Sequence, residues 1–119
     1  MRAFNSFNKI YLCREYVDFR KSIDGLAVIV ESVLKKNSLD GSLFVFICKD
    51  KRRVKLLYWD KTGFALWYKR LEEARFKFLP RYVDGDVIYL TAEKLDWLLS
   101  GLDIFKMNPH EELRYESVC

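Results

Sequence analysis

The residues best suited to chemistry in this sequence are cations gathered in one short stretch. Residues 49–55 contain five of them: Lys49, Lys51, Arg52, Arg53 and Lys55. Lys and Arg side chains neutralise phosphate groups and release the counterions that surround a nucleic acid. The stretch therefore predicts an electrostatic contact with a polyanion, and DNA is the expected partner. An alternative of equal weight is that these charges protect an exposed strand edge from pairing with another chain.

Other cations accompany this stretch. Residues 69–81 add five more, namely Lys69, Arg70, Arg75, Lys77 and Arg81. Arg20 and Lys21 fall in the first turn of a predicted helix, where the helix dipole disfavours positive charge. A phosphate or an acidic partner at the helix start would reverse that cost. Pairing with Asp18 or Asp24 is the simpler explanation, and both remain open.

Aromatic residues are interleaved with the cations. Seven rings lie between residues 58 and 78: Tyr58, Trp59, Phe64, Trp67, Tyr68, Phe76 and Phe78. Exposed rings can stack on nucleic-acid bases, but most of these are expected in the core. Trp59, Trp67 and Tyr68 are the candidates for contacting a partner protein, because large aromatic residues near Arg make good interface anchors.

Patterns typical of catalysis are nearly absent. The only histidine, His110, has no obvious partner with which to act as a base. A metal-dependent nuclease would need carboxylates that bind Mg²⁺, and the candidates are Asp60, Asp84 and Asp86. Each of them falls in a predicted turn, where Asp is common because its side chain makes local hydrogen bonds. We therefore expect no catalytic, cofactor-binding or metal-binding residues, and keep a metal-dependent nuclease as an alternative.

The composition predicts one domain with a substantial core. Half of the 119 residues are apolar and 16% are aromatic, which excludes a disordered chain. No apolar run approaches the ~18–20 residues that a membrane helix needs, and no signal-peptide pattern is visible, so we expect a cytoplasmic protein without membrane contact. The three cysteines, Cys13, Cys48 and Cys119, are odd in number and widely spaced, which argues against zinc or a disulfide framework. Cys13 and Cys48 are expected to be small buried residues.

The net charge of +4 is unevenly distributed along the chain. Residues 49–81 carry 11 basic and 4 acidic groups, whereas residues 82–119 carry 3 basic and 8 acidic groups. The middle of the chain therefore suits a polyanion, and the acidic end suits a basic partner or the middle itself. We expect residues 107–119 to be a mobile acidic tail on an ordered core of about residues 9–106.

The positions of apolar residues predict an α+β fold in a single domain spanning residues 1–119. Helical spacing predicts a long helix over about 19–36 and a shorter one over about 92–100, capped by Thr91. Short runs of strand-forming residues predict a mainly antiparallel meander of about four to six strands. The candidate strands are 9–13, 43–48, 54–59, 64–71, 75–79 and 87–90. The strand at 43–48 is expected to be buried on both faces.

Two longer runs resemble motifs of a known family. Residues 18–26, DFRKSIDGL, are similar to its DMRKSFDGL run, and residues 58–72, YWDKTGFALWYKRLE, are similar to its YWDxxGFxLWYKRLE run. Residues 43–46, 90–95 and 99–102 also match. The family is the TnpB (second reading frame) accessory protein of IS-sixty-six-type bacterial insertion sequences, which is distinct from the RNA-guided nucleases of the same name. The likeness covers roughly residues 9–107.

The resemblance implies a non-catalytic protein, encoded beside a separate DDE-type transposase and needed for efficient transposition. It supplies no catalytic residues. The matching positions are Asp18, Arg20, Lys21, Ser22, Asp24, Gly25, Tyr58, Trp59, Asp60, Gly63, Phe64, Trp67, Tyr68, Lys69 and Arg70. The acidic end departs from the more basic ending of many relatives, which argues against a DNA contact there.

These observations support two hypotheses. In the first, the protein binds DNA or the transposase–DNA complex through a basic face. That face would comprise Arg20, Lys21, Lys49, Lys51, Arg52, Arg53, Lys55, Lys69 and Arg70. In the second, it contacts the transposase without touching DNA. The first depends on cations from distant stretches meeting on one surface. The sequence leaves the preferred DNA, the oligomeric state and the strand order open.

Overall fold

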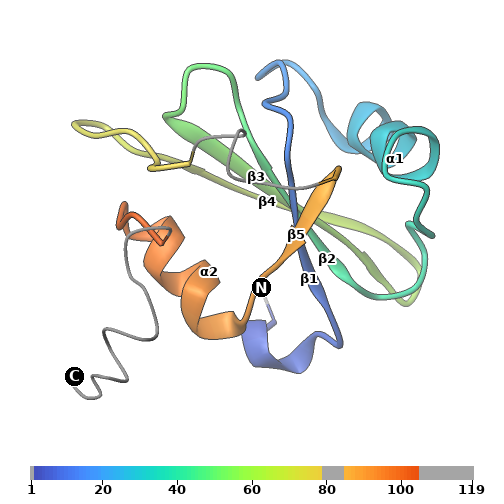
Figure 1. Ribbon diagram of the computed structural model, residues 1–119. Coiled ribbons are helices and arrows are strands. Elements are labelled where there is room, and N and C mark those ends of the chain that lie inside the picture. The colour runs from blue at the N-terminus through green and yellow to red at the C-terminus, as the bar shows by residue number, and fades with distance from the viewer. Residues whose placement is uncertain (1, 79–84, 105–119) are drawn as a thin grey trace.

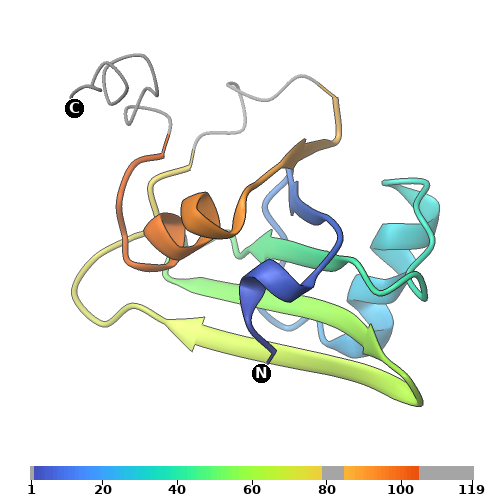
Figure 2. The same cartoon turned by 90° about the horizontal axis from the view of Figure 1, so that it is seen from below.

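The computed structural model describes residues 2–78 and 85–104 and confirms the α+β class. Its elements are η1 (Phe4–Ser6), β1 (Ile10–Cys13), α1 (Ile23–Ser32), β2 (Leu43–Ile47), β3 (Arg53–Asp60), β4 (Gly63–Arg70), β5 (Val87–Tyr89) and α2 (Ala92–Leu99). The five strands form one sheet in the order β4-β3-β2-β1-β5. Figure 2 shows β4 at one edge of this sheet and β5 at the other.

The predicted meander is confirmed for β2, β3 and β4, which pair antiparallel in chain order. β1 differs because it runs parallel to β2, with Leu12 opposite Val45, and antiparallel to β5. Parallel neighbours need a long crossover connection, and the segment that contains α1 provides it. The sheet is therefore mixed, with one parallel pair between β1 and β2.

Two helices cover opposite faces of the sheet (Figure 1). Strand residues alternate between the two faces, so Leu43, Val45 and Ile47 of β2 join the core beneath α2, whereas Phe44 and Phe46 join the core beneath α1. All five are buried, which confirms the prediction of a strand buried on both faces. We refer below to the α1 face and the α2 face.

The predicted helix over residues 19–36 is too long at both ends. A turn precedes α1, in which the carboxylate of Asp18 accepts a hydrogen bond from the main-chain N–H of Arg20 at 2.9 Å. This side chain offers the backbone a partner that competes with helix formation. At the other end Lys35 adopts a left-handed conformation with φ of 55°, which stops the helix. Arg20 and Lys21 therefore lie in a loop, outside the first helical turn.

The predicted strand at 75–79 is wrong over its described residues, since residues 75–78 lie outside every strand. The alternating pattern has another cause. Phe76 and Phe78 are buried in the core beneath α2, and Arg75 and Lys77 between them are exposed. The main-chain N–H of Phe76 donates to the carbonyl of Lys51 at 2.7 Å, which fastens this segment to the β2–β3 turn. An extended segment lying across a core gives the same alternation as a strand.

Other local predictions hold. Thr91 caps α2, because its hydroxyl oxygen accepts a hydrogen bond from the N–H of Lys94 at 3.1 Å. Cys13 and Cys48 are buried free thiols. Burial raises the pKa of Cys13 to about 11, so this thiol stays protonated near neutral pH. The predicted tail at 107–119 lies outside the described residues. Within the described ranges, no helix is both long and apolar enough to cross a membrane.

Candidate nucleic-acid interface

Three stretches that are far apart in sequence meet at one end of the sheet, where β2 turns into β3 and β4 ends. Arg53 pairs with Arg70 across β3 and β4. Val17 forms a parallel bridge to Cys48, and the N–H of Lys49 donates to the Val17 carbonyl at 2.9 Å. The N–H of Leu71 donates to the carbonyl of Arg52 at 2.7 Å. We call this region the basic end, defined as residues 18–21, 49–55 and 68–72.

Lys55 is buried within the basic end and binds main-chain carbonyls of its 18–21 loop. Its side chain is 8% exposed, and its ammonium donates to the carbonyl of Phe19 at 2.5 Å and to the carbonyl of Lys21. A buried ammonium needs such acceptors, because an unpaired charge in the interior is costly. Lys55 is therefore an interior residue that holds the 18–21 loop in place through hydrogen bonds. The sequence predicted it at the DNA-binding surface, and that prediction is wrong for its side chain.

Lys69 also binds the main chain, but on the other face. Its neighbours on β4 alternate, so Tyr68 and Arg70 lie on the α1 face, whereas Lys69 reaches α2. Its ammonium donates to the carbonyl of Leu99 at 2.9 Å, at the last residue of the helix. A cation at this position complements the negative end of the helix dipole. Lys69 thus ties α2 to the sheet.

Three arginines of the basic end form ion pairs at the surface. Arg20 binds Asp18 through two nitrogens, at 3.0 and 2.7 Å. Arg53 binds Asp50 at 2.5 Å, and Arg70 binds Glu72 at 2.8 Å. The hydrogen bonds from Arg20 hold the pKa of the Asp18 carboxyl well below its usual range.

The remaining predicted cations form no ion pair within the part of the chain that the structure describes. They are Lys21, Lys49, Lys51 and Arg52. Lys21 and Lys49 are exposed, and Lys49 lies close enough to favour the charged form of Asp18. Lys51 lies 5.5 Å from the centre of the Tyr16 ring. Arg52 donates to the carbonyl of Glu72 at 3.1 Å.

The loop of the basic end borders a hollow of about 400 Å³. It is lined by Asp18, Arg20 and Lys21. Arg75 and Lys77 are exposed in the segment that follows β4, and Arg81 lies outside the described residues. The structure thus places Arg20 and Lys21 beside the start of β3, while Lys55 and Lys69 point inward to main-chain carbonyls. The predicted face is therefore smaller than the sequence hypothesis required, because Arg20, Arg53 and Arg70 are also paired with acids.

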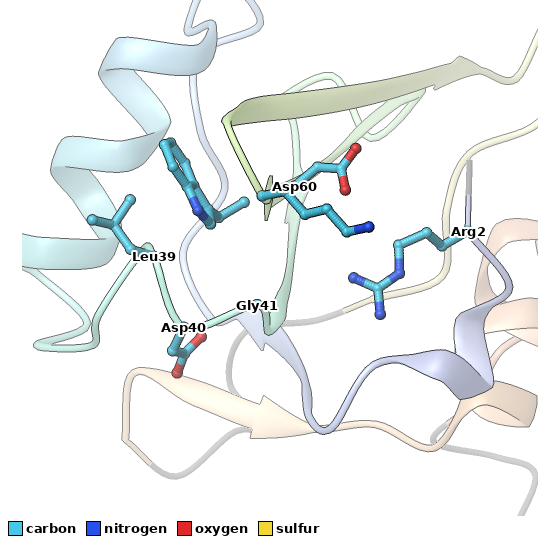
Figure 3. A pocket seen from close by; sticks show the side chains of 7 residues that line it. Arg2, Leu39, Asp40, Gly41 and Asp60 are labelled. Carbon is cyan, nitrogen blue, oxygen red and sulfur yellow. The ribbon is translucent and has the colours of Figure 1, made fainter.

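The three predicted partner-binding rings do not share a surface. Trp67 and Tyr68 are consecutive in β4 and face opposite sides of the sheet, and Trp59 lies at the far end of β3. Trp59 borders a pocket of about 540 Å³ at the opposite end of the sheet. Figure 3 shows this pocket, with Arg2, Leu39 and Asp60 labelled among its lining side chains. The other lining residues are Arg2, Leu39, Asp40, Gly41, Asp60 and Lys61. Trp67 packs against the core beneath α2 and borders a smaller hollow of about 240 Å³ beside η1. Tyr68 belongs to the basic end. No single partner surface contains all three.

Sequence reasoning missed Phe19. Its ring is 51% exposed and lies against Arg53, whose guanidinium carbon is 4.5 Å from the ring centre. The helix predicted over residues 19–36 includes this residue, and the available signal is its position inside the DFRKSIDGL motif. Across residues 2–78 and 85–104, no group of three or more His, Cys, Asp or Glu side chains is placed to hold a metal ion. His110 and Asp84 fall outside these ranges.

Comparison with known proteins finds one matching family model and similar relatives. A family model described as IS66 Orf2 like protein matches residues 8–109. Two proteins of Sinorhizobium fredii (strain NBRC 101917 / NGR234), the uncharacterized proteins y4jC and y4hO, are each 35% identical to this chain over 95 residues. The aligned region covers 80% of this chain, and 80% and 81% of the two relatives, respectively. No solved structure gives a significant match.

Proposed function

Because this chain belongs to the family of IS66 Orf2 like proteins, we propose that it is a non-catalytic accessory protein of DNA transposition that binds DNA through its basic end. In this proposal the protein acts in the cytoplasm, on DNA or on the transposase–DNA complex of its own element. No catalytic step, cofactor or metal is assigned to it.

The observation that carries the proposal is the position of Lys21 and Lys49. They come from distant stretches, are exposed and form no ion pair among the described residues. Lys21 lines the same hollow as Asp18, and Lys49 is close enough to favour the charged form of that carboxyl. Unpaired surface cations that converge in this way are the electrostatic footprint of a nucleic-acid site. Family membership independently favours a role in transposition, where DNA is the substrate.

The ion pairs of Arg20 and Arg70 are compatible with DNA binding. Both pairs are at the surface, with side-chain exposures of 79% and 52% for the two arginines. Exposed pairs of this kind contribute little to stability, because water and salt screen them. A phosphate can therefore compete for either guanidinium at little cost. Arg53 is less available, since its pair with Asp50 is more buried.

The test is equilibrium binding of the purified protein to a labelled DNA duplex at several salt concentrations, measured by fluorescence anisotropy. If four or five phosphates are neutralised, the logarithm of the association constant falls linearly with the logarithm of the salt concentration, with a slope of about −4. Absence of binding at about 50 mM salt, for both element-end and random sequence, would remove direct DNA binding.

A second candidate function is a contact with the DDE-type transposase. The pocket beside Trp59 favours it, because it places an indole ring among charged side chains at the surface. Large aromatic residues in such surroundings are common interface anchors. Co-purification of the transposase that survives nuclease treatment, and is lost in Trp59→Ala, would support this candidate. Failure to co-purify at any salt concentration would count against it.

A further inference from the structure

Two exposed rings lie together on the α1 face of the basic end. Phe19 is 51% exposed and Tyr68 is 48% exposed, whereas Phe44 and Phe46 of the same face are completely covered. Arg53 links the two exposed rings, because its guanidinium lies over Phe19 and its Nε donates to the Tyr68 hydroxyl at 3.1 Å. We call Phe19 and Tyr68 the aromatic pair. Large apolar side chains gathered at the surface mark a contact site.

A cation lies close to each ring of the aromatic pair. Arg53 lies 4.5 Å from the centre of the Phe19 ring, and the Lys55 ammonium lies 5.9 Å from the centre of the Tyr68 ring. Lys55 also binds the main-chain carbonyl of Phe19, which fixes the backbone that carries that ring. About half of the surface of each of the two residues is open to solvent. The pair is therefore held in place while leaving surface for a ligand.

Cations also flank the aromatic pair. Arg20 and Lys21 follow Phe19 directly, and Arg70 lies on the same face of β4 as Tyr68 and pairs with Arg53. All three flanking side chains are exposed. Ring faces beside cations that can hold a phosphate backbone are the arrangement found in proteins that bind single-stranded nucleic acids.

We infer that the aromatic pair stacks on unpaired bases, so that the basic end binds single-stranded DNA more tightly than duplex DNA. This inference rests on the proposed function and specifies its substrate. A duplex hides the faces of its bases in the stack and offers only phosphates and groove edges, which Phe19 cannot use through hydrogen bonds. A single strand offers both a phosphate backbone and free base faces.

The experiment compares a labelled oligothymidine with a duplex of equal length at one salt concentration. We expect the wild-type protein to bind the single strand more tightly. In the double variant Phe19→Leu/Tyr68→Leu, affinity for the single strand should fall by about tenfold or more, because stacking on each ring is lost. Affinity for the duplex should change little. Tyr68→Phe, which keeps the ring, should retain single-strand binding.

Tyr89→Leu is the matched control, because Tyr89 is an exposed ring on the edge strand β5, away from the basic end. It should bind both DNA forms as the wild type does. The inference would be overturned if the wild type bound the two forms with equal affinity. It would also be overturned if the double variant lost affinity for the single strand no more than for the duplex. In both cases the proposed function would stand. Failure of the wild type to bind either form would remove both. Circular dichroism of each variant shows whether the fold is kept.

Discussion

Replacing Lys21, Lys49 and Arg70 by Gln in one protein is expected to weaken duplex DNA binding about 30-fold at low salt. Each of the three residues comes from a different stretch of the basic end, and each is exposed. A charge about 6 Å from a phosphate in water changes affinity about threefold, so three of them change it about 30-fold. The slope of log affinity against log salt should become about 2.7 less steep, at about 0.9 for each lost phosphate contact.

The matched control removes the same charge elsewhere. Lys9, Lys35 and Lys61 are also exposed, and they lie before β1, after α1 and in the β3–β4 turn, outside the basic end. Their triple replacement by Gln lowers the net charge equally. If both triple variants lose affinity to the same extent, binding depends on overall charge, and the basic end is not the site. If neither variant loses affinity, these cations do not contact DNA.

Lys55→Met is expected to lower the free energy of unfolding by about 2 kcal/mol. Methionine keeps the apolar stem within β3 but removes the ammonium, so the carbonyls of Phe19 and Lys21 lose their donor. The corresponding fall in the melting temperature is about 10 °C for a domain of about 100 residues. Thermal unfolding followed by circular dichroism measures it. Lys77→Met is the control, since Lys77 is exposed, and its replacement should change stability by less than about 0.5 kcal/mol.

The same variant also tests the role given to Lys55 in positioning the loop. Releasing residues 19–21 should disorder Phe19 and Lys21, so DNA affinity should fall although Lys55 itself is buried. A Lys55→Met protein as stable as the wild type would show that the two hydrogen bonds contribute nothing net. Unchanged affinity in a destabilised protein would show that the 18–21 loop is not part of the site.

Much of the fold could be predicted because local pattern and tertiary structure agree. The unbroken apolar run of β2 indicates burial on both faces, and Thr91 followed by an apolar stripe indicates a capped helix. The parallel pairing of β1 with β2 could not be predicted, since it depends on which edge the chain reaches after α1. The alternation of charged and aromatic residues around Phe76 wrongly predicts a strand. Burial of the aromatic rings alone, without strand pairing, produces the same pattern.

The location of the candidate site stays a prediction, and the orientation of its side chains could not be read from the sequence. The density of cations between residues 49 and 55 indicates a basic surface. The structure places the main chain of Lys21 beside that stretch, where its carbonyl accepts from Lys55. That Lys55 points inward depends on two carbonyls more than 30 residues earlier in the chain, which no local pattern encodes. The orientation of the Lys69 side chain likewise depends on a distant acceptor, the carbonyl of Leu99 at the end of α2. Phe19 is exposed only because its segment forms a loop held outside the helix.

The most direct test of the central claim is a titration of isotope-labelled protein with duplex DNA, followed by backbone amide chemical shifts. DNA binding at the basic end predicts that the largest changes cluster in residues 18–21, 49–53 and 68–72. Amides around the pocket of Trp59, at residues 39–41 and 59–61, should change little. Shift changes centred on that pocket, or none at any DNA concentration, would contradict the account.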